Sequence, residues 1–170
     1  PYGNFQSNKG REKMNYVMVT GPMGAGKSTF MRSLPKPQGN FIVPDNVPDM
    51  WLDFSCEING KMFYEIDAPT ATGKMWIDWL KAADMQIIVG NGLKEPDEHF
   101  LELWEYLQDN TPNTKRLIVL NRTKIIEKGW KKYGNETLLC VGMGKTIDEE
   151  TALASESDIL AVLKYLDNNL

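Results

Sequence analysis

The sequence predicts a three-layer α/β domain whose sheet is mostly parallel and contains one antiparallel strand. Three observations support this fold class. Short apolar runs alternate with stretches of helical periodicity along the chain. The dipeptide Asn59-Gly60 lies between two such runs and favours a two-residue hairpin turn. The chain has 170 residues, about the size of one domain, so we expect one sheet covered by helices on both faces.

The first half of the chain supplies a strand, a helix and a hairpin. The strand covers 16–20, where the residues are apolar, and a glycine-rich stretch ends it before a helix that begins near Ser28. The proline-rich segment 35–50 fits neither a helix nor a central strand and predicts an extended surface loop. The hairpin strands are expected at 54–58 and 61–66.

The second half alternates helices with strands. Apolar runs at 85–89 and 116–120 are typical of buried parallel strands, and the amphipathic stretch 95–108 between them completes a βαβ unit. The remaining elements are a strand at 137–141 and helices at 74–83, 125–133 and 150–166. The expected order is therefore β-α-β-β-α-β-α-β-α-β-α. Because the carboxyl ends of parallel strands share one edge, ligands are expected there, at the loops after Thr20, Ile66, Leu120 and Val141.

Composition and charge exclude several kinds of partner. The 23 acidic residues outnumber the 19 basic ones, for a net charge of -4, so we expect no broad basic surface and no nucleic-acid partner. No apolar run approaches the roughly 20 residues that span a bilayer. The first residues also lack the apolar core of a signal peptide. We therefore expect no transmembrane segment and a cytoplasmic location.

Two further features concern the cysteines and the beginning of the chain. Cys56 and Cys140 are isolated within apolar stretches, which favours buried thiols over a zinc site or a disulfide. Residues 1–13 are polar and patternless, and we expect a tag remnant or a disordered segment ahead of a domain at 14–170.

Residues 21–28 read Gly-Pro-Met-Gly-Ala-Gly-Lys-Ser and fit the phosphate-loop pattern GxxxxGK[ST], between a strand and a helix as the pattern requires. Lys27 is expected to contact the β- and γ-phosphates and to serve catalysis, and Ser28 to ligate Mg²⁺. The sequence thus predicts a P-loop NTPase domain, the alternative being a structural glycine turn with an incidental lysine. The candidate nucleotide-binding residues here are Gly21, Met23, Gly24, Ala25, Gly26, Lys27, Ser28 and Thr29.

Asp67 follows the expected strand 61–66 and should reach the same edge of the sheet as the phosphate loop. We interpret it as a second Mg²⁺ partner, with a turn-forming aspartate before Pro69 as the alternative. A second Gly-Lys-Thr at 144–146 lacks the leading glycine of the motif, because residue 139 is leucine, and we interpret it as part of a loop beside the base.

In order and spacing, these motifs resemble the Ras and Arf superfamily of small GTPases over about 14–168. The resemblance implies a switch that binds GTP and GDP with Mg²⁺. It also implies that a regulatory or effector protein contacts the loops at 35–52 and 67–76. The base-contact residues that it implies are Asn121, Arg122, Lys124, Gly142 and Met143.

The chain departs from that family at three places. The family's DxxG reads Asp67-Ala68-Pro69-Thr70, and no Gln follows it to orient water. No Thr or Ser lies between Pro35 and Asp53 to supply the switch hydroxyl. We therefore expect slow or partner-dependent hydrolysis. Lys124 replaces the family's base-reading aspartate and offers only donors, so the choice between GTP/GDP and ATP/ADP stays open.

Other interpretations remain at this stage. The loop at 21–29 also resembles that of shikimate kinase, which makes an ATP-dependent small-molecule kinase the main alternative. Such an enzyme needs several arginines around the transferred phosphoryl group, and the chain has four, at 11, 32, 116 and 122. A nucleotide-gated binding module without hydrolysis is a third hypothesis. Asn121 could also be a simple turn residue, and Arg122 a surface residue.

Overall fold

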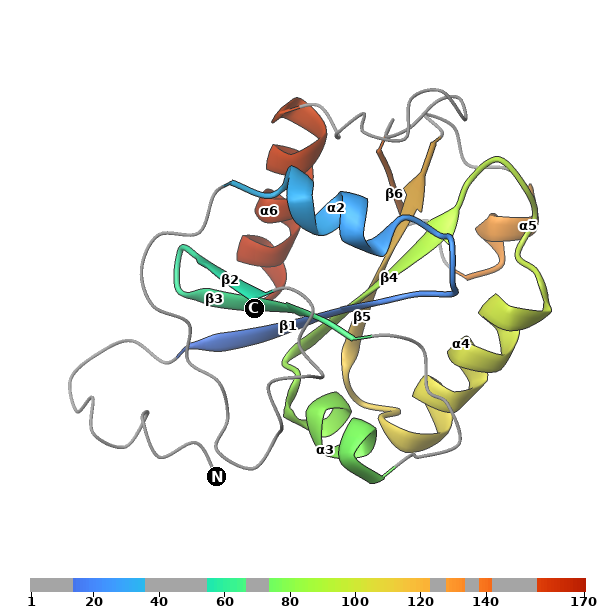
Figure 1. The fold of residues 1–170 in the computed structure, drawn as a ribbon, viewed down its shortest axis with the longest axis horizontal. Helices are drawn as coiled ribbons and strands as arrows, with labels where there is room; N and C mark the ends of the chain where they lie inside the picture. The colour runs from blue at the N-terminus through green and yellow to red at the C-terminus, as the bar shows by residue number, and fades with distance from the viewer. Residues whose placement is uncertain (1–13, 36–54, 67–73, 123–127, 134–137, 142–155) are drawn as a thin grey trace.

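The computed structural model describes residues 14–35, 55–66, 74–122, 128–133, 138–141 and 156–170 (Figure 1). Several expectations lie outside this part of the chain. They concern residues 1–13, most of the loops 35–52 and 67–76, the side chains of Cys56 and Cys140, and the candidate site residues Asp67, Lys124, Gly142 and Met143.

Six strands form one sheet in the order β2-β3-β1-β4-β5-β6. Their bounds are β1 Asn15–Thr20, β2 Ser55–Ile58, β3 Lys61–Glu65, β4 Met85–Asn91, β5 Lys115–Asn121 and β6 Leu138–Val141. All neighbouring strands are parallel except β2 and β3, which form the hairpin. Asn59 and Gly60 adopt φ angles of 50° and 77°, the left-handed region that a tight hairpin turn requires. The predicted sheet, with its single antiparallel strand, is confirmed.

The helices follow in the predicted order, with some shifted ends. Their bounds are α2 Lys27–Ser33, α3 Lys74–Ala82, α4 Glu98–Asn110, α5 Lys128–Lys131 and α6 Glu156–Asn169. Helix α4 begins at Glu98 rather than at 95, because the Asp97 side chain accepts a hydrogen bond of 3.0 Å from the Phe100 backbone N–H and caps the helix. Strand β4 runs beyond its expected end at 89, because Gly90 and Asn91 continue to pair with β5.

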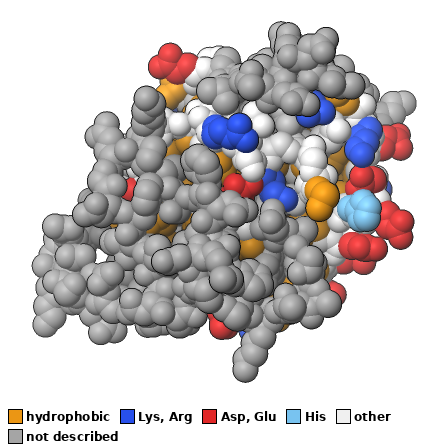
Figure 2. Space-filling model, viewed as in Figure 1, with side chains coloured by type: hydrophobic (Ala, Val, Ile, Leu, Met, Phe, Trp, Pro, Cys, Tyr) orange, Lys and Arg blue, Asp and Glu red, His pale blue; other side chains and the backbone are white. Residues whose placement is uncertain are grey.

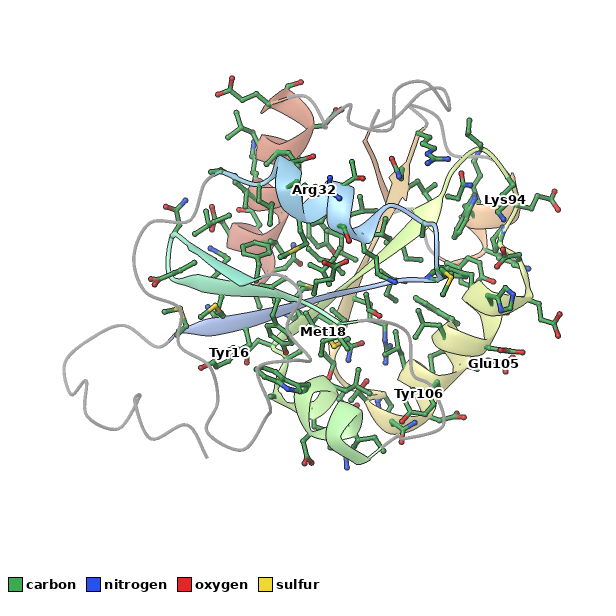
Figure 3. All side chains as sticks on the ribbon, in the orientation of Figure 1. Tyr16, Met18, Arg32, Lys94, Glu105 and Tyr106 are labelled. Carbon is green, nitrogen blue, oxygen red and sulfur yellow. The ribbon has the colours of Figure 1, made fainter. Side chains whose placement is uncertain are left out.

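The helices cover both faces of the sheet, which confirms the three-layer architecture (Figure 1). Helices α2 and α6 pack on one face, where Val17 and Val19 of β1 contribute to the core. Helices α3, α4 and α5 pack on the other, toward which Tyr16 and Met18 of β1 project (Figure 3). Successive side chains of β1 thus enter opposite core layers, as expected for a strand buried on both faces.

Helix α6 is fastened to two strands that are not neighbours. The Lys61 ammonium on β3 pairs with the Asp167 carboxylate. The Lys115 ammonium on β5 donates a hydrogen bond to the backbone carbonyl of Asn169. Because β1 and β4 lie between β3 and β5, the end of α6 reaches across four strands.

The five parallel strands end at the same edge, which places the segment after β1 next to the ends of β3, β4 and β5. This is the edge at which ligands bind in open α/β sheets. Among the described residues, no helix is both long and apolar enough to cross a membrane.

Candidate functional site

The segment 21–28 forms a closed loop between β1 and α2. The Ala25 backbone N–H donates to the Pro22 carbonyl at 3.1 Å. The Lys27 ammonium turns back into the loop and donates to the Gly21 carbonyl at 2.8 Å. Although lysine is normally a surface residue, Lys27 is only 8 % exposed. The loop therefore holds a buried charged donor, which its own backbone fixes in place.

The loop is also joined to the end of β5. The side-chain amide of Asn121 donates to the Ala25 carbonyl at 2.9 Å, and Asn121 is 2 % exposed. Gly26 has a φ of 102°, and a Cβ atom there would lie 2.0 Å from the Asn121 Nδ2 atom. The absence of a side chain at Gly26 thus leaves room for the Asn121 side chain, which comes from a distant part of the sequence. Asn121 is consequently more than a turn residue.

Ser28, the last residue of the motif, has a partner that the sequence analysis missed. Its hydroxyl donates a hydrogen bond of 2.8 Å to the Glu65 carboxylate at the end of β3. Glu65 is 1 % exposed. Asp67, for which we predicted a role beside Ser28, lies outside the described residues. The signal for Glu65 was its place as the last residue of a buried strand adjacent to β1.

The other predicted site residues have distinct surroundings. Met23 is 97 % exposed at the tip of the loop. The Thr29 carbonyl accepts a hydrogen bond of 2.7 Å from the Ser33 hydroxyl. Arg122, beside Asn121, has a φ of 66°, which is strained for a residue with a side chain. Its Nε atom is buried and, within the described chain, has no hydrogen-bond partner.

A small pocket of about 30 Å³ lies beside the loop. It is lined by residues 22–25 of the loop, the end of β4, the segment before α4, and Trp130 of α5. The Trp130 indole N–H donates to the Lys94 carbonyl at 2.9 Å, and its ring packs so close to Gly90 that an added Cβ would lie 2.6 Å from it.

The charged groups near the pocket are partly paired with each other. The Lys94 ammonium lies 3.1 Å from the Asp97 carboxylate. The hydrogen bond from the Phe100 backbone N–H, aided by Lys94, lowers the pKa of Asp97 below its ordinary value. Figure 2 shows scattered lysines and arginines on this face and acidic side chains gathered over α4. The exposed acidic residues of α4 are Glu98, Glu102, Glu105 and Asp109.

Comparison with known proteins addresses the fold. No protein-family model and no curated protein matches the chain. Among solved structures, the G domain of the FeoB iron transporter from T. maritima is similar with a TM-score of 0.53 and 16 % identity, over 90 % of this chain and 99 % of that one.

Two Era structures are similar at the same level. Era in complex with MgGDPNP and nucleotides of 16S ribosomal RNA gives a TM-score of 0.55 and 14 % identity, over 91 % of this chain and 57 % of that one. A variant of Aquifex aeolicus Era bound to GDP and AlF4⁻ gives 0.50 and 17 %, again over 91 % and 57 %. The chain therefore spans little more than half of the Era chains. Its fold is similar to that of the FeoB G domain and of the matching part of Era.

Proposed function

We propose that this protein binds a nucleoside di- or triphosphate in the loop 21–28 and acts as a GTPase-like switch. The observation that carries the proposal is the position of Lys27, a buried charged side chain that donates to the Gly21 carbonyl of the loop. A buried ammonium costs free energy unless an anion or several acceptors compensate it. Phosphate oxygens are strong acceptors for such an ammonium, and the backbone N–H groups of the loop would donate to the same phosphates.

The binding step exchanges one partner of Lys27 for another. Without nucleotide, the ammonium donates to a loop carbonyl. With nucleotide, we expect it to donate to the oxygens of the β- and γ-phosphates, a charge-assisted contact that is stronger than one to a neutral carbonyl. Asn121 donates to the Ala25 carbonyl and so fixes the shape of the loop before phosphate binds.

The oxygen atoms at and near Ser28 also suit a magnesium ion as ligands. Mg²⁺ prefers hard oxygen ligands and commonly combines one or two protein oxygens with phosphate oxygens. Ser28 offers an exposed hydroxyl oxygen, and a buried carboxylate lies within hydrogen-bond distance of it. Ser28 would hold the ion together with the phosphates, with a carboxylate at the end of β3 beside it. When bound, the ion would neutralise part of the phosphate charge.

Hydrolysis is proposed to be slow or to depend on a partner. The chain has neither a switch hydroxyl between Pro35 and Asp53 nor a glutamine directly after Thr70. A regulatory or effector protein would act at the loops 35–52 and 67–76. The preference for guanine or adenine depends on Lys124, which offers donors where a guanine-specific site offers an acceptor.

The small-molecule kinase has less support. Arg116, one of four arginines, is committed to the fold: its guanidinium donates to the Gln86 side chain at 3.0 Å and to the Leu107 carbonyl at 2.7 Å. Arg32 projects from the last turn of α2 as an exposed side chain (Figure 3). Neither forms part of an arginine-rich lid.

The experiment that tests the proposal is a nucleotide titration of the purified protein. Fluorescent GDP and ADP analogues would be titrated with and without Mg²⁺, and any nucleotide that copurifies would be identified by chromatography. We expect saturable binding and weak discrimination between the bases. In Lys124→Asp we expect discrimination to favour GDP, because a carboxylate accepts from guanine N1–H and N2–H. Absence of binding to either analogue would refute the proposed function.

A further inference from the structure

The carboxylate of Glu65 occupies a place where charge is costly. Glu65 ends β3 and pairs with Val19 of β1, and only 1 % of it is exposed. It lies on the same face of β3 as Phe63, which belongs to the apolar layer beneath α2 and α6. Lys61, further along that face, is paired with Asp167. A carboxylate in such a layer is destabilising unless a specific contact compensates it.

One contact of Glu65 is with the residue that the motif assigns to magnesium. The Ser28 hydroxyl donates to Glu65 Oε1 at 2.8 Å, although the two residues are 37 positions apart. The residues differ in exposure, because Glu65 is buried and Ser28 is exposed. Ser28 therefore presents its proton to the interior, toward β3.

This direction determines what the serine oxygen can do. A hydroxyl group has one proton and two lone pairs, and the proton rotates to suit its strongest acceptor. With the proton held by a carboxylate, the lone pairs of Ser28 are left for a cation on the exposed side. A negatively charged acceptor also makes the Ser28 oxygen more basic and thus a better ligand. Carboxylates that accept hydrogen bonds from metal ligands have this effect in other metal sites.

We infer that Glu65 is a positioning residue for magnesium, which accepts the Ser28 proton and turns the lone pairs of that hydroxyl toward the ion. The inference rests on the proposed function. It assigns this task to Glu65, which belongs to no motif. A hydrogen bond already in place before the ion arrives lowers the cost of ordering the ligand.

The test compares the magnesium dependence of nucleotide affinity in four single variants and one double variant. Glu65→Met removes both the acceptor and the charge, whereas Glu65→Gln keeps an acceptor oxygen without the charge. Ser28→Ala removes the ligand, and Glu102→Gln, an exposed residue of α4, is the control. For each protein, a fluorescent GDP analogue is titrated without Mg²⁺ and then at rising MgCl₂ concentrations. The melting temperature of each variant is measured alongside.

We expect Glu65→Met to raise the MgCl₂ concentration needed for half-maximal effect by about 10- to 100-fold, the range typical of residues behind a metal ligand. The affinity without Mg²⁺ should stay within about threefold of wild type, since Glu65 does not contact phosphate in this mechanism. Glu65→Gln should lie between Glu65→Met and wild type. In a Ser28→Ala background, Glu65→Met should cause no further loss, because the two residues act as one unit.

The outcomes separate the two proposals. If wild type binds the analogue but its magnesium dependence is the same in Glu65→Met, the role of Glu65 is wrong and the proposed function stands. If wild type binds no nucleotide, both fall. If Glu65→Met does not fold, Glu65→Gln alone decides: a shift of threefold or more supports the inference, and a smaller one overturns it.

Discussion

The side chain of Asn121 donates to the Ala25 carbonyl at 2.9 Å, and this contact joins the last residue of β5 to a loop 96 positions earlier in the chain. The same amide lies where a side chain at residue 26 would have to be placed. The phosphate loop is thus shaped partly by a residue on a different strand.

Asn121→Ala should weaken nucleotide binding by about tenfold and destabilise the fold by about 1–3 kcal/mol, because it leaves the buried Ala25 carbonyl without a donor. Nucleotide titration and urea denaturation measure the two effects. Asn113→Ala, at an exposed position before β5, is the matched control and should change neither. Wild-type affinity in Asn121→Ala would show that the contact is incidental to the loop.

Gly26→Ala should destabilise the protein more than Gly24→Ala. Both glycines have positive φ angles, 102° and 77°, so each substitution costs about 1–2 kcal/mol in backbone strain. Only at Gly26 would the new Cβ collide with a neighbour, which should add about 1–3 kcal/mol. Urea denaturation without nucleotide compares the two variants. Equal losses would mean that Asn121 can move aside without cost.

Lys27→Ala should abolish nucleotide binding, with an affinity at least about 100-fold lower, because the buried charge that faces the phosphates is lost. Isothermal calorimetry with GDP and ADP provides the measurement. Lys81→Ala, an exposed lysine of α3, should bind as wild type does. Unchanged affinity in Lys27→Ala would remove the main support for the site.

Turnover without a partner should be slower than roughly 10⁻³ s⁻¹, the scale of unassisted small GTPases, because the chain has no visible residue to orient the attacking water. A single-turnover assay with radiolabelled triphosphate and Mg²⁺ measures this rate. Release of phosphate within seconds by the isolated protein would mean that the catalytic residue lies elsewhere in the sequence.

Asp97→Ala should destabilise the fold by about 1 kcal/mol at pH 7, because Asp97 caps α4. The hydrogen bond from Phe100 lowers the pKa of Asp97, so this stabilisation is present above the ordinary carboxyl pKa. It is lost as the pH falls through the lowered value. Urea denaturation should thus separate variant and wild type at pH 7 and bring them together in acid, once the pH lies below the lowered pKa of Asp97.

The control for the cap is Asp109→Ala, near the other end of α4. An acidic residue there is unfavourable to the helix dipole, so its removal should stabilise slightly or change nothing. A loss at Asp109 as large as that at Asp97 would indicate a general effect of acidic residues on this helix.

The sequence predicts most of the fold because each strand carries a local signal. Buried parallel strands such as β4 and β5 are continuous apolar runs, and Asn59-Gly60 marks the hairpin. Helix ends are less predictable, since they depend on single capping bonds. Asp97 is such a case: its side chain starts α4 three residues after the expected start.

The candidate site was predictable only where a motif is contiguous. The segment 21–28 could be recognised as a phosphate loop because the spacing and the types of its residues are enough to define the pattern. The Ser28–Glu65 contact was not readable, because two residues 37 positions apart meet only once the register of β1 and β3 is known. The pairing of Val19 with Glu65 sets that register, and a shift by one residue would turn Glu65 to the other face.

The fastening of α6 has a mechanical consequence. Lys61 and Lys115 attach the end of this helix to β3 and β5, with β1 and β4 held between them. A pull on Leu170 would first load these two contacts and only afterwards the hydrogen bonds of the sheet. The helix thus behaves as a strap over the strand from which the phosphate loop emerges. When force is applied at Leu170 in a single-molecule measurement, the phosphate loop should therefore be the last of these parts to bear it.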